Sequence, residues 1–115
     1  MTAQVDYQKV WDNAVSMGRM AAQIADAALG DENSRGLDCG FAWVTIRPAR
    51  GAFVSWLKKH GHGHNAYGGG WEIWYSEFSD GRTQSISVHE AAAKAFRDSL
   101  VQDLGISPTV GSRYD

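Results

Sequence analysis

"CGFAWVTIRP", residues 39–48, is the stretch that decides the fold. It is rich in β-branched and aromatic residues, carries no charge before Arg47 and ends at Pro48. These features are typical of a buried strand, which we place at residues 41–46. The segments on either side are expected to supply the helices that cover one face of the sheet containing this strand.

The segment before the strand predicts one long helix. Between Asp6 and Leu29, apolar residues recur mostly at spacings of three and four, as they do on one face of an amphipathic helix. Gly30 is expected to end this helix, because glycine adopts the left-handed conformation without a steric penalty. Val15 and Met20 extend the apolar surface beyond that face, and this predicts a homo-oligomer joined through the helix.

The segment after the strand predicts a short helix and then a second strand. Phe53, Val54 and Leu57 share one helix face, and the helix closes on two lysines, whose charges suit the negative pole of its dipole. Residues 71–76 alternate in the manner of a strand with one buried face. Asp80-Gly81 then predicts a hairpin turn, with residues 83–88 returning as a third strand.

A last helix is predicted from "SVHE", residues 87–90. This is a capping box, in which the Ser87 hydroxyl accepts from the Glu90 amide and the Glu90 side chain reaches back to the amide of Ser87. Gly105 stands where a glycine commonly ends a helix.

The expected fold class is therefore α+β. We predict a small three-stranded, mainly antiparallel sheet, packed by a long N-terminal helix, a short middle helix and a C-terminal helix. At 115 residues the chain suits a single domain, 1–115, with the N-terminal helix at 1–29 and an α+β core at 40–115.

Composition and charge exclude some classes of function. A net charge of -2 argues against a protein that holds duplex DNA mainly by neutralising phosphates. The single cysteine, Cys39, cannot form an intramolecular disulfide, and no apolar run is long enough to span a bilayer. We expect a cytoplasmic protein that does not insert into a membrane and carries no cofactor.

"HGHGH", residues 60–64, is the candidate metal motif. In an extended segment, His60, His62 and His64 would point to one side, and imidazole binds zinc, copper or nickel. The intervening glycines make ordering costly, and no nearby carboxylate obviously orients the rings. The pattern favours a polar loop that ends a helix over a metal site.

A basic and aromatic region is the candidate ligand site. If the glycine loop at 67–70 folds back over the short helix, it brings cations and rings together, and this combination suits single-stranded nucleic acid or a free nucleotide. Strand alternation also sends Trp71 and Trp74 to opposite faces, so one of them is exposed or covered by a partner. The candidate residues are Arg47, Arg50, Lys58, Lys59, Tyr67 and Trp74.

Gln84 and Ser85 are two further candidates, because they are polar where the expected hairpin is half buried. They either line a pocket or make hydrogen bonds on an exposed strand face. No signature of a nucleophilic hydrolase is present, so nothing in the sequence requires an enzyme.

The order of several short motifs resembles a group of small uncharacterised proteins encoded by bacteriophages and prophages. The motifs are "RPARGAFVSWLKK", "AYGGGWEIW", "TQS", "HEAAAKAFRDSLVQDLGI" and a terminal Ser-Arg-x-Asp, here "SRYD". The resemblance covers residues 40–115, with Tyr114 where an aliphatic residue is expected. It implies a C-terminal tail docked on the domain, in which Arg113 pairs with a carboxylate or a phosphate.

These observations lead to two main hypotheses. The first is a non-enzymatic phage accessory protein that binds a host protein, or sequesters a nucleotide signal, in the cytoplasm of the host cell during anti-defence or takeover. The second is a protein that binds single-stranded nucleic acid. A metal-dependent hydrolase built on the histidines is the third and least favoured.

Overall fold

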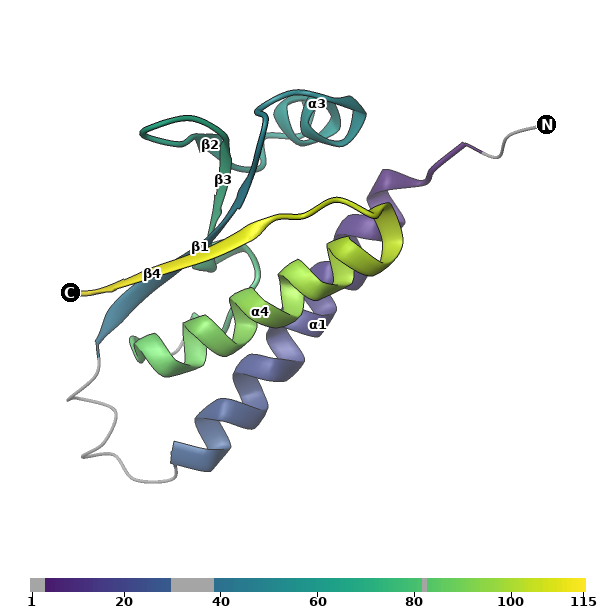
Figure 1. Ribbon diagram of the computed structural model, residues 1–115. Coiled ribbons are helices and arrows are strands. Elements are labelled where there is room, and N and C mark those ends of the chain that lie inside the picture. Colours follow the sequence, from purple (N-terminus) through teal and green to yellow (C-terminus); the bar gives the residue numbers. More distant parts are fainter. Residues whose placement is uncertain (1–3, 30–38, 82) are drawn as a thin grey trace.

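The computed structural model describes residues 4–29, 39–81 and 83–115 and shows an α+β fold (Figure 1). The elements follow the order α1 (Tyr7–Leu29), β1 (Gly40–Ile46), α3 (Ala52–Lys59), β2 (His64–Asn65), β3 (Trp71–Trp74), the 3-10 turn η1 (Tyr75–Glu77), α4 (Ile86–Leu104) and β4 (Thr109–Tyr114). The predicted fold class is confirmed, but the antiparallel sheet has four strands, in the order β2-β3-β1-β4, where three were expected.

β1 is the longer of the two inner strands of the sheet. It pairs with β3 on one side, where Trp43 faces Trp74, and with β4 on the other, where Trp43 faces Gly111. Ala42, Val44 and Ile46 are buried, as expected of the strand face that meets the helices.

The two long helices form one layer on this face of the sheet. α4 packs against the strands and α1 lies alongside α4 (Figure 1). Their core contacts include Trp11 of α1, which meets Phe96 of α4 edge to face at a centroid distance of 5.5 Å. α1 also approaches the chain after η1 closely, since a Cβ added at Gly18 would lie 2.5 Å from the carbonyl oxygen of Phe78.

The predicted helices are confirmed in position. α1 begins within one residue of the expected start, while the expected stop at Gly30 lies outside the described residues. α3 buries Phe53, Val54 and Leu57, the three residues assigned to its inner face.

The predicted hairpin is wrong. Residues 83–88 do not return as a strand; Ser85 makes only an isolated bridge with Cys39, and α4 begins at Ile86. The buried side chain of His89 explains the difference, because Ser79 Oγ lies 2.7 Å from its Nδ1 and its Nε2 donates to the Thr83 carbonyl at 3.1 Å. These bonds hold the segment after η1 against α4, where it cannot extend along β3.

The predicted capping box is wrong by two residues. Ser85, not Ser87, is the N-cap of α4, and its hydroxyl accepts from the amide of Val88 at 3.4 Å. Glu90 serves the C-terminal tail instead, because its Oε2 accepts from Ser112 Oγ at 2.6 Å. The tail lies in the sheet as β4, paired with β1 along its whole length.

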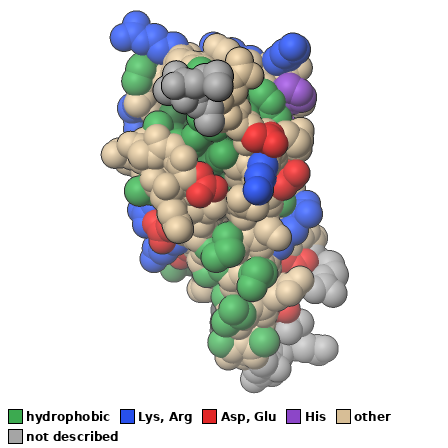
Figure 2. Space-filling model, turned by 90° about the vertical axis from the view of Figure 1, so that its right-hand side faces the viewer, with side chains coloured by type: hydrophobic (Ala, Val, Ile, Leu, Met, Phe, Trp, Pro, Cys, Tyr) green, Lys and Arg blue, Asp and Glu red, His purple; other side chains and the backbone are tan. Residues whose placement is uncertain are grey.

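Exposed apolar side chains lie on the outer side of α1. Met17, Met20 and Ile24 are 47%, 54% and 69% exposed, whereas Val15, which was assigned to the same surface, is buried. Figure 2 shows hydrophobic side chains on the narrow lower end of the molecule, where α1 extends beyond α4. In the part of the chain that the structure describes, no helix combines the length and the apolar character needed to cross a bilayer.

The position of the helix cap can be tested with two serine variants. Ser85→Ala should lower the free energy of unfolding by about 1 kcal/mol, since it removes the oxygen that satisfies a helix-end amide. Ser87→Ala, at an exposed position in the first turn, should lower it by less than Ser85→Ala does, because Ser85 is buried and caps the helix. Urea denaturation measures both values, and a larger loss in Ser87→Ala than in Ser85→Ala would contradict the assigned cap.

Candidate nucleic-acid interface

The face of the sheet opposite the helix layer carries a row of aromatic side chains. Alternation turns Phe41 and Trp43 of β1 and Trp74 of β3 to this side, which no described helix covers, and all three are half buried. The rings are in contact, with centroid distances of 5.5 Å between Trp43 and Trp74 and 5.8 Å between Phe41 and Trp74. We call this surface, with the strand residues beside it, the open face.

Gly111 of β4 lets the Trp43 ring lie across the neighbouring strand. A Cβ added at Gly111 would be 2.4 to 2.7 Å from three atoms of the Trp43 indole. The φ angle of Gly111 is not positive, so glycine is required here by the close approach of the ring and not by backbone conformation. The ring is therefore packed against the β4 backbone.

Two arginines lie on the open face near opposite ends of β1. Arg113 of β4 stands opposite Phe41 and places its guanidinium 5.7 Å from the centre of that ring. Arg47 follows the other end of β1, and its Nη1 donates to Thr109 Oγ1 at 3.4 Å. Phe41 and Arg47 are six residues apart, which corresponds to roughly 20 Å along an extended strand. The two cations therefore bracket the aromatic row.

The acidic residue on this face, Glu72, is engaged by its neighbours. Its Oε1 accepts hydrogen bonds from Trp74 Nε1 and, at 3.2 Å, from His64 Nε2, and its side chain is only 15% exposed. These bonds fix the edge of the Trp74 ring and engage Oε1 of the carboxylate.

The other predicted ligand residues do not join the open face. Lys58 donates to the Ala49 carbonyl at 3.2 Å and lies over the ring of Trp71, which points into the opposite, buried face. Arg50 lines a hollow beside α3, Lys59 is exposed at the end of that helix, and Tyr67 is fully exposed on the glycine loop. The structure thus divides the expected basic and aromatic region between several surfaces.

Gln84 and Ser85 have different environments. Ser85 is buried as the cap of α4. The Gln84 carbonyl accepts from the Gly40 amide at 2.9 Å, and the residue lines a hollow of about 120 Å³ next to Phe41. Only Gln84 is therefore placed to reach a ligand that lies on the open face.

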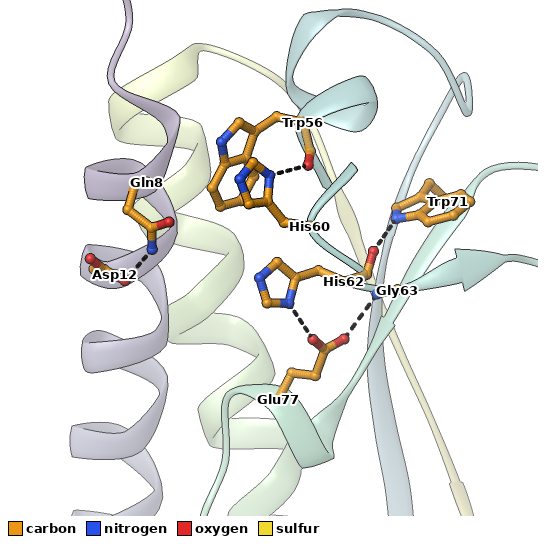
Figure 3. Close-up of polar contacts among 8 residues, drawn as sticks. All are labelled: Gln8, Asp12, Trp56, His60, His62, Gly63, Trp71 and Glu77. Atoms are coloured by element: carbon orange, nitrogen blue, oxygen red, sulfur yellow. Dashed lines mark hydrogen bonds and ion pairs between the residues drawn. The ribbon is translucent and has the colours of Figure 1, made fainter. Parts of the chain in front are cut away.

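The three histidines turn to three separate partners, and Figure 3 shows those of His60 and His62. His60 donates to the Trp56 carbonyl at 2.9 Å, His62 to Glu77 Oε1 at 2.8 Å, and His64 to Glu72. Carboxylates distant in sequence thus orient two of the rings, although none was expected to do so. Among the described residues, no three His, Cys, Asp or Glu side chains are arranged to hold a metal ion.

His62 closes its loop onto the body of the protein. Its ring stacks on Trp11 at a centroid distance of 4.0 Å, and the second oxygen of Glu77 accepts from the Gly63 amide at 3.0 Å. The backbone carbonyl of His62 accepts from Trp71 Nε1 at 2.9 Å. His62 and Glu77 also line a groove of about 510 Å³ beside α1. These contacts give His62 a structural role at the edge of that groove.

Sequence reasoning missed Phe41, Trp43 and Gly111. The strand at residues 41–46, which contains Phe41 and Trp43, was interpreted as buried, whereas only one of its faces meets the helices. A usable signal was present, because aromatic residues at 41 and 43 alternate with the small and aliphatic residues 42, 44 and 46.

The packing of Trp43 on Gly111 predicts the effect of one added methyl group. Gly111→Ala should displace the ring and lower the free energy of unfolding by about 1 to 3 kcal/mol, as overpacking does. The near-ultraviolet circular dichroism of the tryptophans should change with it. Gly81→Ala is the matched control, since a Cβ there meets nothing within 4 Å; equal effects of the two changes would contradict the assigned contact.

The two hydrogen bonds that Glu77 accepts in the histidine loop should contribute to stability. Glu77→Gln should lower the free energy of unfolding by about 1 to 2 kcal/mol, because a partly buried carboxylate accepting two hydrogen bonds is replaced by a neutral amide. Asp98→Asn, which removes the carboxylate of an exposed pair with Arg97, should have an effect below about 0.5 kcal/mol. Guanidinium denaturation measures both effects. An unchanged free energy of unfolding in Glu77→Gln would show that the hydrogen bonds of Glu77 do not stabilise the fold.

Comparisons of this chain with protein-family models, with curated proteins and with solved structures gave no match. Its function is therefore inferred from the geometry of its own surfaces.

Proposed function

We propose that this chain is a non-enzymatic binding protein that holds single-stranded nucleic acid on its open face. The observation that supports the proposal best is the contiguous row of Phe41, Trp43 and Trp74 on an uncovered sheet face, with an arginine near each end of β1. Bases stack on such rings whatever their sequence, and arginines pair with the phosphates between them.

A single strand fits this surface better than a duplex does. The rings of the open face are only half buried, whereas the faces of bases in a duplex are already stacked on one another. The net charge of -2 also gives the protein little general attraction for a duplex, whereas two local arginines can meet the backbone of a strand.

An extended strand also fits better than a free nucleotide. Sites that enclose a small molecule are usually concavities of about 300 to 1,000 Å³. The hollow beside Phe41 has only about 120 Å³, and the half-buried rings of the aromatic row lie on a sheet face that no described helix covers. The span of roughly 20 Å between Phe41 and Arg47 leaves room for several successive nucleotides.

The wider role expected from the sequence stays a prediction. A phage accessory protein that acts on a host protein or a nucleotide signal would be one setting for this binding, and it needs evidence from the host cell. Homo-oligomerisation and a cytoplasmic location are likewise predictions.

Tryptophan fluorescence provides the test. Short single-stranded RNA and DNA of mixed sequence should quench the emission, and log K should fall steeply with log salt concentration. Trp74→Ala should weaken binding about tenfold or more, the effect of losing one stacked base, and Arg113→Ala should reduce the salt slope by about 1.

Arg97→Ala is the control, because Arg97 lies on α4 and pairs with Asp98 away from the open face. It should bind like the unmodified protein. Absence of quenching by both RNA and DNA at low salt, or equal weakening by Arg97→Ala and Arg113→Ala, would rule out binding at this face.

A further inference from the structure

The two edges of the sheet offer very different templates for another strand. β2 contributes only His64 and Asn65, whereas β4 runs over six residues, all paired in continuous register with β1. Natural sheets protect long edges with lysine, proline or a bulge. Residues 109–114 contain no lysine and no proline, and their register has no bulge. Their one charged side chain, Arg113, lies over the Phe41 ring. The free side of β4 is therefore open to pairing.

The hydrogen-bond pattern identifies which residues face outward. The Asp115 amide donates to the Cys39 carbonyl at 3.0 Å, so these two residues form a hydrogen-bonded pair. Hydrogen-bonded and non-hydrogen-bonded pairs alternate along an antiparallel ladder. Val110, Ser112 and Tyr114 consequently turn their amides and carbonyls away from β1, and these groups have no hydrogen-bond partner among the described residues.

We propose that β4 pairs antiparallel with β4 of a second copy of the chain, around a two-fold axis at Ser112. This register sets each outward residue opposite an outward residue of the second copy, because Ser112 is the middle of the three. Ser112 then faces its own counterpart, and Val110 faces Tyr114 in both directions. Three hydrogen-bonded pairs form, each exchanging two bonds, and two sheets join into one.

The side chains fit this register. Val110 opposite Tyr114 is a β-branched and aromatic pair of the kind that stabilises antiparallel sheets. It gives a partner to the Tyr114 side chain, which is 72% exposed in the single chain. On the open face, Arg113 of each copy comes opposite Gly111 of the other, so the two arginines do not oppose each other. A second copy therefore matches this edge in side chains as well as backbone.

The pairing would also complete the open face. Gly111 lies under the Trp43 ring, so Arg113 of the partner copy would stand beside that ring, where a cation interacts favourably with indole. The two aromatic rows would then form one surface for a longer single strand of nucleic acid. This last step rests on the proposed function, whereas the pairing of the copies does not.

A proline variant tests the pairing directly. The Ser112 amide points away from β1, so Ser112→Pro removes bonds to the second copy and none to β1, and proline is tolerated at such edge positions. Sedimentation without nucleic acid should show a dimer for the unmodified chain. Ser112→Pro should raise its dissociation constant about tenfold or more. Ser112→Ala is the control, because it removes only the hydroxyl bonded to Glu90 and should remain a dimer.

Amide hydrogen exchange tests the register in the unmodified chain and does not depend on any variant folding. At concentrations that favour the dimer, the amides of 110, 112 and 114 should be protected together with those of 111 and 113. On dilution the first set should exchange fast while the second stays protected.

Fast exchange at 110, 112 and 114 at every concentration would overturn the proposal. A dimer that persists unchanged in Ser112→Pro would do the same and would direct attention to the apolar side of α1. A monomer that still binds oligonucleotides would refute the pairing alone, and a dimer that binds none would refute the proposed function alone.

Discussion

The pairing of β1 with β4 is the constraint on which the rest of the molecule depends. It joins Gly40 to Tyr114, residues at opposite ends of the described core, and makes β1 an inner strand. Because β4 follows α4 closely, the same pairing holds α4 across the sheet, where Glu90 accepts from Ser112. It also brings Gly111 under Trp43 and Arg113 to Phe41. One set of backbone bonds therefore positions both the helix layer and the open face.

The features that could be predicted from the sequence are those with a local physical cause. Helix periodicity and the alternation of Trp71 and Ile73 with Glu72 and Trp74 depend on neighbours a few residues apart, and they predicted α1, α3, β3 and the fold class. The predicted hairpin was wrong because hydrogen bonds of the His89 side chain, made across six and ten residues, outweigh the local turn signal of Asp80-Gly81. His89 bonds to Ser79 and Thr83, and no local pattern shows that this buried imidazole would hold the segment before α4. The N-cap of α4 is Ser85 and not the predicted Ser87, because Ser85 carries the same hydroxyl group two residues earlier.

The candidate site was predicted in part. Arg47, Trp74 and Arg113 were named from the sequence and lie on the open face, but the rings that connect them were assigned to the core. The error arises from the strand at 41–46, where β-branched and aromatic residues were taken as a sign of a buried strand. Lys58 shows the opposite error, because it lies beside an aromatic ring, Trp71, that faces the other side of the sheet. Closeness in the sequence did not show which residues share a face of the sheet. The alternation of side chains along β1 and β3 determines it.

The two tryptophans of β3 show how one short strand serves both faces. Trp71 points inward and is held by the His62 carbonyl and by Lys58 over its ring. Trp74 points outward and is held by Glu72, which His64 also contacts. The histidine loop thus contributes hydrogen bonds on both sides of the strand. Because Trp43 is packed against β4 and Trp74 is fixed at its edge, the rings of the open face are ordered before any ligand arrives, and stacking on them loses little side-chain entropy.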